Sequence, residues 1–182
     1  MTAHVPQRLD LVSSQAPAVS RSAFAEAFSR MASTVCVISG SDGGTFHGRT
    51  ATAVLSLTIE PPTVVVSVKG GCPLARVIRA TGGFSLAMLS RGQERVADAF
   101  AGKVEPAQRH LIGVWGAWPS GRPHLIGSAA AIDCELAGAI AAADHELFVG
   151  TIIATDVPER SQPLLWANRR YGFLRDGEVT GA

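Results

Sequence analysis

The sequence predicts a mainly β domain, an antiparallel barrel with helices attached at its periphery. Strand-like runs follow one another in groups and do not alternate with helices, which argues against a doubly wound parallel sheet. Residues 50–58 and 129–136 alternate between polar and apolar side chains, the period of a strand with one face on a core. The length of 182 residues fits one domain with a substantial core.

The first part of the chain predicts a loose arm, one helix and a hairpin. Residues 1–20 lack sustained periodicity and indicate an arm that is ordered only where it docks on a neighbour. Residues 34–39 are rich in β-branched side chains, and the Ser-Asp-Gly-Gly turn at 41–44 joins them to a second strand beginning at Thr45. Between the arm and the hairpin, an apolar stripe at helical spacing predicts a helix that covers the core: Phe24, Ala27, Phe28 and Met31.

The central part predicts two more strands and two helices. Residues 63–68 and 84–89 are short apolar runs typical of buried strands. The helix between them has Pro73 in its first turn, where proline is tolerated best, and ends at Gly82 and Gly83. Its predicted buried stripe consists of Leu74, Val77 and Ile78. A capping-box match at residues 90–93 predicts a further helix that runs to about Phe100.

The last part predicts a loop-rich passage and two strands. Residues 104–128 carry Trp115 and Trp118, aromatic side chains that more often plug a core than bind a ligand, and the sequence leaves the role of this passage open. The strand at 129–136 is expected to turn its two acidic residues away from the core, and residues 147–154 form a long aliphatic strand. The whole chain thus predicts five to seven strands and two or three helices.

Composition and charge limit the classes of partner and the cellular compartment that we expect for this protein. An apolar content of 47% against a charged content of 17% favours a buried subunit interface and therefore a homodimer. The net charge of +1, with no basic cluster beyond Arg169 and Arg170, argues against nucleic acid or an anionic membrane as the main partner. Three widely spaced cysteines and the absence of a membrane-length or signal-like apolar run predict a cytoplasmic protein without disulfides.

One segment, residues 47–62, carries the predicted binding chemistry. Residues 43–50 fit a phosphate-loop pattern with Arg in place of lysine, but a turn precedes them and a strand-like pattern follows, which is the wrong context. The five histidines lack metal-ligand spacing, so no metal is expected. Hydroxyl side chains with almost no charge suit a neutral ligand rich in hydroxyl and carbonyl groups: Thr50, Thr52, Ser56 and Thr58.

Five segments in order resemble the short-chain flavin reductase family, the reductase partners of two-component flavin-dependent monooxygenases, which have the FMN-binding split-barrel fold. The resemblance spans residues 22–174, and its segments are residues 28–38, 47–62, 100–102, 144–150 and 163–171. It implies a Greek-key-like split β-barrel at residues 21–176, between the arm and a tail at 177–182. It also implies transfer of a hydride from NADH or NADPH to FMN or FAD, with the reduced flavin diffusing to a monooxygenase.

The resemblance assigns His145 to the nicotinamide, as the catalytic contact. Ala143 and Glu146 depart from the glycine and threonine that are usual around this histidine. Basic residues usual near the flavin phosphates are missing at Gly71 and Pro73, which leaves Arg49, Lys69 and Lys103 as candidates for that charge. The residues implied for cofactor binding are Arg49, Thr50, Ala51, Thr52, Ala53, Ser56, Leu57, Gly71, Cys72, Pro73, Phe100, Ala101, Gly102, Lys103, His145 and Tyr171.

Two other functions are compatible with a split barrel. The first is a flavin- or heme-binding sensor or carrier that does not turn over NAD(P)H. The second is an oxidase that acts on an amine such as a pyridoxine phosphate, which would need a cluster of basic residues for the substrate phosphate. No such cluster is visible in the sequence. The absence of a conventional catalytic triad fits a reductase, because hydride transfer depends mainly on stacking and orientation.

Overall fold

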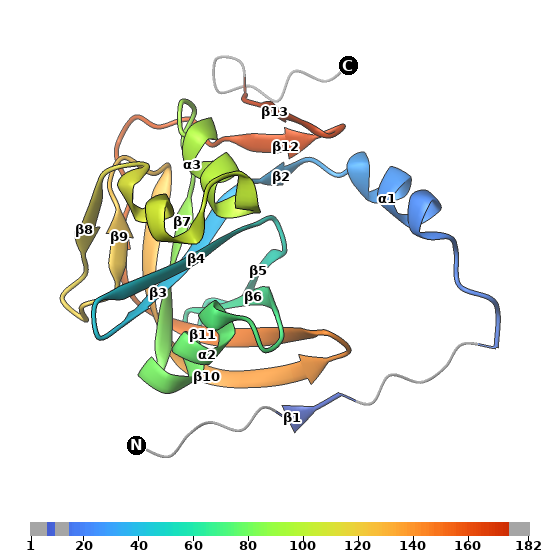
Figure 1. Ribbon diagram of the computed structural model, residues 1–182, viewed down its shortest axis with the longest axis horizontal. Helices are drawn as coiled ribbons and strands as arrows, with labels where there is room; N and C mark the ends of the chain where they lie inside the picture. The colour runs from blue at the N-terminus through green and yellow to red at the C-terminus, as the bar shows by residue number, and fades with distance from the viewer. Residues whose placement is uncertain (1–6, 10–14, 175–182) are drawn as a thin grey trace.

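A computed structural model of the chain describes residues 7–9 and 15–174. Its main feature is a curved, mainly antiparallel sheet with the strand order β4-β3-β7-β10-β11-β6-β5, and β1 pairs with β10 (Figure 1). This arrangement confirms the predicted mainly β split barrel with attached helices. The strands are β1 (Gln7–Arg8), β3 (Cys36–Asp42), β4 (Thr45–Ala51), β5 (Val54–Thr58), β6 (Thr63–Lys69), β7 (Gly83–Met88), β10 (Ala130–Ala142) and β11 (His145–Asp156).

Smaller elements surround this sheet. A three-stranded sheet lies at the top of Figure 1, and a separate hairpin lies at its left. The predicted five to seven strands were too few, because strands of two or three residues are too short to show a period. These further elements are β2 (Ser33–Thr34), β12 (Leu165–Ala167), β13 (Arg170–Gly172), the hairpin β8 (Trp115–Ala117) and β9 (Pro123–Leu125), α1 (Arg21–Ser29), α2 (Pro73–Thr81), α3 (Glu94–Asp98), a π-helical turn (Ala99–Lys103) and a 3₁₀ helix (Pro106–Leu111).

The predicted single strand at residues 50–58 is two strands, β4 and β5. Ala51 of β4 pairs with Cys36 of β3, whereas Val54 of β5 pairs with Val66 of β6. The chain must therefore change partners at Thr52 and Ala53, which belong to neither strand. The sequence alternation breaks at Val54, where the second strand begins. Since β4 and β5 are the two ends of the sheet order, this corner is the place where the barrel is split.

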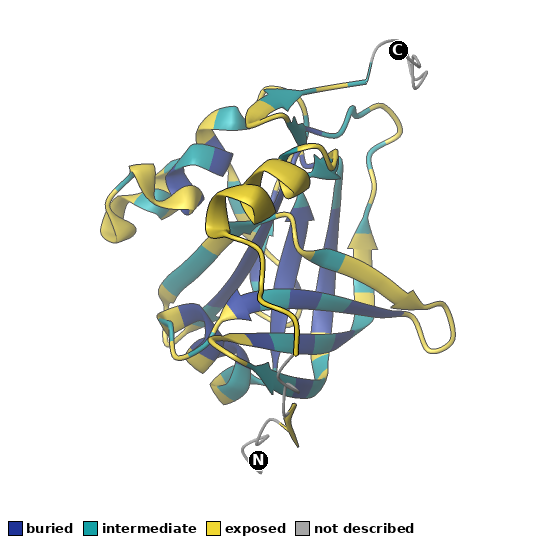
Figure 2. Cartoon of the chain, turned by 90° about the vertical axis from the view of Figure 1, so that its right-hand side faces the viewer, coloured by how far each residue is buried: buried dark blue, intermediate teal, exposed yellow. Residues whose placement is uncertain are grey.

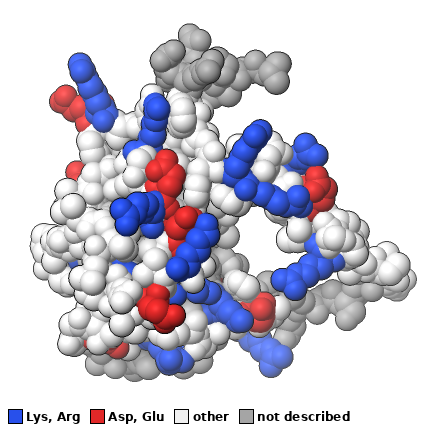
Figure 3. Space-filling model, turned by 45° about the horizontal axis from the view of Figure 1, so that its top comes forward, with Lys and Arg blue, Asp and Glu red and all other residues white. Residues whose placement is uncertain are grey.

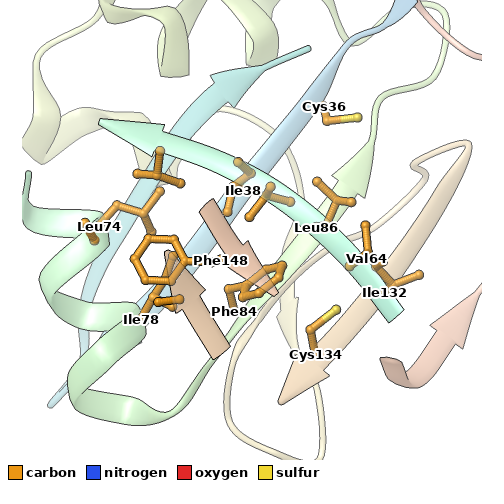
Figure 4. Close-up of a cluster of buried hydrophobic side chains, with 14 residues drawn as sticks. Cys36, Ile38, Val64, Leu74, Ile78, Phe84, Leu86, Ile132, Cys134 and Phe148 are labelled. Carbon is orange, nitrogen blue, oxygen red and sulfur yellow. The ribbon is translucent and has the colours of Figure 1, made fainter. Parts of the chain in front are cut away.

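Helix α2 closes one side of the core as predicted. The Cys72 Sγ accepts a hydrogen bond from the Ala75 N–H, Pro73 occupies the first turn, and Gly82 ends the helix at φ 71°. Its apolar face, which includes Leu74 and Ile78, packs with Phe84 and Phe148 from the sheet (Figure 4). Burial of such side chains stabilises the fold by about 1.5–3 kcal/mol each.

A second core cluster lies between β3, α3 and the π-helical turn. It contains Val37, Phe100 and Leu164, with Trp115 packed against it. Trp118 is also buried, so both tryptophans of the loop-rich passage plug the interior. The helix predicted to open with the capping box at residues 90–93 and to run to about Phe100 begins later, at Glu94 of α3, and has no side-chain cap. The π-helical turn continues it past Phe100.

The prediction that the first helix covers a core is wrong for the single chain. Helix α1 has no buried residue, and Phe24, Phe28 and Met31 are each more than half exposed. Figure 2 shows α1 as an exposed helix in front of the buried strands. Its described contacts with the body are near its end, where the Asn168 N–H donates to the Ser29 carbonyl at 2.6 Å. The apolar stripe is real, but its spacing does not say what covers it.

The predicted strand at 147–154 is confirmed as part of β11, which pairs with β10 in a long hairpin. Two further expectations need correction. Residues 7 and 8 of the arm form β1 and run parallel to Ile140 and Ala141 of β10, so this part docks on its own chain. Asp133 faces the interior, because Arg122 beside the β8–β9 hairpin pairs with it at 3.0 Å. The tail at 177–182 lies outside the described residues, as does most of the arm.

Candidate functional site

Two hollows adjoin β4. The larger, of about 340 Å³, is lined by Arg49 from β4, by Cys72 and Pro73 at the start of α2, and by Phe100 and Arg109. The smaller measures about 210 Å³. Its lining, from β4, the β4–β5 corner, the π-helical turn and the small sheet, consists of Val35, Thr50, Ala51, Thr52, Ala101, Trp166 and Tyr171.

Phe100 forms a wall of the larger hollow because β4 has no side chain at Gly48. An added Cβ at Gly48 would lie 2.7 Å from the Phe100 ring. The ring also packs against Phe46 and Trp115, with ring centroids 5.6 Å away in each case. This aromatic cluster thus fixes the π-helical turn against β4. A hydrogen bond of 2.6 Å from the Thr50 Oγ1 to the Ala97 carbonyl ties β4 to α3 as well.

Tyr171, Asp98 and Lys103 form a hydrogen-bonded group beside the smaller hollow. The Tyr171 hydroxyl donates to the Asp98 Oδ1 at 2.7 Å, and the Lys103 Nζ donates to the same oxygen at 2.9 Å. These bonds, that of Lys103 first, lower the pKa of Asp98. Burial and the nearby carboxylate raise the pKa of Tyr171, so its hydroxyl stays protonated. Lys103, a predicted phosphate contact, is therefore already paired in this structure.

His145 lies at the tip of the β10–β11 hairpin, outside both hollows. Its Nδ1 donates to the Asp144 Oδ1 at 2.8 Å, and this bond lowers the pKa of Asp144. Across the sheet His145 pairs with Lys69 of β6. Ala143 in the tight turn before it has φ 52°, a conformation in which glycine is unstrained. The histidine is exposed and free to contact a ligand at the surface.

The structure gathers most, not all, of the predicted site residues around β4. Arg49, Cys72, Pro73 and Phe100 line the larger hollow; Thr50, Ala51, Thr52, Ala101 and Tyr171 line the smaller one. Gly71 and Gly102 adjoin the lining residues Cys72 and Ala101 in the chain, and Lys103 follows Gly102. Ala53 is exposed at the corner, and Ser56 and Leu57 are exposed on β5.

Sequence reasoning missed Phe46, Arg109 and Trp166 as lining residues. A signal existed for Trp166, because it pairs with Tyr171 across a hairpin whose turn residues Asn168 and Arg169 both have positive φ. An aromatic pair flanking Asn-Arg could have been read as a short hairpin. Arg109 lies in a 3₁₀ helix whose position beside β4 depends only on tertiary packing.

The donor set around β4 fits a flavin. Within residues 7–9 and 15–174, no hydrogen bond or ion pair engages the guanidinium of Arg49 or the hydroxyl of Thr52. An uncommitted cation, an uncommitted hydroxyl and aromatic walls can hold a phosphate, a polar ring edge and an apolar ring face. The face in Figure 3 mixes basic and acidic side chains.

Two kinds of feature are absent from the described part of the chain. No helix there is long and apolar enough to cross a membrane. No group of three or more His, Cys, Asp or Glu side chains in these residues could hold a metal ion.

Comparisons with known proteins point to one family. Residues 28–175 match the family model described as a flavin reductase like domain. The reductase component of the FADH(2)-dependent resorcinol hydroxylase from Rhizobium sp. (strain MTP-10005) is 34% identical over 144 residues, covering 78% of this chain and 80% of that protein. The FMN reductase (NADH) RutF from Ancylobacter novellus is 28% identical over 157 residues, covering 86% of this chain and 87% of that protein.

A solved structure agrees with these sequence matches. The styrene monooxygenase flavin reductase from Pseudomonas putida S12 superposes with a TM-score of 0.74 and 28% identity, covering 84% of this chain and 97% of that chain. The fold, the donor set around β4 and a family match over most of the described residues agree. This chain therefore belongs to the family of flavin reductase like domains.

Proposed function

We propose that the protein is a flavin reductase that transfers a hydride from NADH to FMN or FAD and releases reduced flavin to a partner monooxygenase. The observation that carries this proposal is the pair of hollows along β4, in a chain of this family. Within the described residues, the Arg49 guanidinium and the Thr52 hydroxyl that line these hollows are uncommitted. A relative named as an NADH-dependent FMN reductase favours NADH over NADPH. The free cysteines fit a reducing, cytoplasmic setting.

A bound flavin supplies the electron-accepting ring, and the protein supplies binding and orientation. Arg49, uncommitted within the described residues, faces the larger hollow and is suited to a phosphate. Thr52, beside Ala51 and Ala101, offers a hydroxyl and peptide groups to a polar ring edge. His145 on the hairpin tip is suited to hold the nicotinamide. Holding two reacting rings about 3–3.5 Å apart accounts for much of the rate of such a step.

The direct test mixes the protein with NADH and excess free flavin and follows absorbance of the nicotinamide band. A reductase consumes many equivalents of NADH for each protein chain, whereas a flavin- or heme-binding carrier consumes at most one. Running the four pairs of FMN or FAD with NADH or NADPH then establishes cofactor preference. Stoichiometric consumption with all four pairs would contradict the proposal.

The flavin position on β4 can be tested by comparing two hydroxyl residues. Thr52→Val should weaken flavin binding by about 0.5–1.5 kcal/mol, the contribution of one neutral hydrogen bond. Ser56→Ala should have a similar effect only if the site reaches β5, because Ser56 lies outside both hollows of the single chain. Flavin titrations of both variants show whether the site is confined to β4 and its corner or reaches β5. Unchanged flavin affinity in both variants would place the flavin elsewhere.

The protein acts as a homodimer in this proposal. The exposed stripe of α1 and the exposed Leu55, Leu57 and Ile59 of β5 and the loop after it are large apolar surfaces without cover in the single chain. A partner on β5 would also bring Ser56 and Leu57 into a shared cleft. Sedimentation at micromolar concentration should give a dimer, and a monomer would contradict this part of the proposal.

A further inference from the structure

Glu146 is a buried carboxylate on the hairpin that carries His145. The residue is 6% exposed and lies two positions before the buried Phe148, so its side chain is on the core face of β11. A carboxylate in such a place costs free energy unless it is paired and hydrogen-bonded. Its contacts therefore matter to the fold around it.

The partners of Glu146 lie on α2 and on the segment that leads into it. Its Oε1 accepts a hydrogen bond from the Gly71 N–H at 3.4 Å. Its Oε2 accepts from the Nη1 of Arg79 on α2. Arg76, also on α2, donates to the Gly71 carbonyl. The peptide groups of Gly71 are thus held on both sides, by a carboxylate and by a guanidinium.

The neighbouring Gly70 is held by the same hairpin. Its N–H donates to the Asp144 carbonyl at 2.8 Å. A Cβ at this position would lie 3.3 Å from that carbonyl and 3.4 Å from the Glu146 Oε1, so the backbone approaches the hairpin closely because it is glycine. Gly71 itself has φ 68°, which other residues rarely adopt.

These contacts place the wall of the larger hollow. The two glycines lead directly into Cys72 and Pro73, which line the hollow together with Arg49. On β11 the side chain of His145 points to the strand face opposite Glu146, because successive side chains alternate. Glu146 therefore joins the start of α2 to the hairpin tip proposed to meet the nicotinamide.

We propose that Glu146, together with Arg79, is a positioning residue that clamps the segment at residues 70 and 71 and thereby sets the flavin-binding wall at Cys72 and Pro73. The inference rests on the proposed function, because it concerns the binding of that flavin. Glu146 does not touch the flavin. Loss of the clamp loosens the wall, so flavin affinity falls while the reduction step at saturating flavin is retained.

The test uses Glu146→Gln, which keeps the shape and the acceptor for Gly71 but removes the charge opposite Arg79. Flavin dissociation constants should rise by about three- to tenfold, and kcat at saturating flavin should stay within about twofold of wild type. Arg79→Gln should raise the flavin dissociation constants by the same factor, because it removes the other partner of the same ion pair. The double variant should bind flavin about as weakly as either single variant, because both substitutions remove the same contact.

Asp133→Asn is the matched control. Asp133 is also a buried carboxylate paired with an arginine, on the neighbouring strand β10 and outside both hollows. Its variant should lower the melting temperature and leave flavin affinity within about twofold of wild type. The clamp is overturned if Glu146→Gln and Arg79→Gln both bind flavin like wild type, or if Asp133→Asn weakens flavin binding equally. A wild-type protein that does not turn over NADH with flavin would instead overturn the proposed function itself.

Discussion

Replacing His145 by alanine separates a nicotinamide contact from a structural histidine. The side chain is 48% exposed, and its described partner Asp144 is 75% exposed. An exposed pair contributes little to stability, so the melting temperature of His145→Ala should stay within about 2 °C of wild type. Loss of a histidine that capped a buried turn would lower the melting temperature further. The exposure of His145 argues against that role.

The expected defect lies in the use of NADH. Loss of one hydrogen bond to the nicotinamide lowers kcat/KM for NADH by about two- to tenfold. The flavin dissociation constant should not change, because His145 lies outside the hollows that hold the flavin in our proposal. Stopped-flow reduction, a flavin titration and a thermal melt on the same variant measure the three quantities.

His110→Ala provides the control, since His110 is an exposed histidine in the 3₁₀ helix and lies outside both hollows. It should leave all three quantities unchanged. A His145→Ala variant that reduces flavin at the wild-type rate would refute the nicotinamide contact. A fall of several degrees in its melting temperature would refute it as well, because the histidine would then support the fold.

Three other predictions concern packing, thiol labelling and the pH dependence of stability. Gly48→Ala should destabilise the fold by about 1–3 kcal/mol, measured by denaturant unfolding, because the new methyl group meets the buried Phe100 ring; full stability would show that the ring can move. A thiol reagent should modify Cys72 alone in the native protein, and rapid labelling of all three cysteines would contradict the burial of the others. Burial, the main cause in both, raises the pKa of Cys36 and Cys134 to about 12. The thiol of an unfolded cysteine ionises near pH 8.5. The free energy of unfolding should therefore be retained below that pH and fall as the pH rises toward 12. Unfolding curves at pH 8 and pH 10 measure this difference.

Local signals predicted the elements that depend on neighbours in sequence. Pro73 and Gly82 delimit α2 because helix ends follow from the backbone preferences of these residues. The alternation at residues 50–58 indicated strand, and its one irregularity at Val54 coincides with the change of partner. The partner change itself could not be predicted, because pairing with β3 or β6 is a property of the whole sheet.

Features that depend on distant segments were missed or misassigned. The alternation around Asp133 has the pattern of a solvent-facing acid, and only Arg122 makes its burial possible. The stripe of α1 has the pattern of a core helix, although the single chain leaves it exposed. For the site, the hydroxyl pattern and the resemblance supplied the residues of β4. The clamp at Glu146 could not be predicted, because its contact with Gly71 joins residues 75 positions apart.

The order of strands in the sheet differs from the order in which a ribosome makes them. Strands β3 to β6 are synthesised before β7 and β11, yet β3 needs β7 and β6 needs β11 as partners. The strand that joins the two halves, β10, pairs with both β7 and β11 and is among the last to emerge. A nascent chain that stops before residue 145 thus has an unpaired edge on β6, a template for aggregation. Productive folding therefore waits for the last third of the chain, and early termination products should be insoluble.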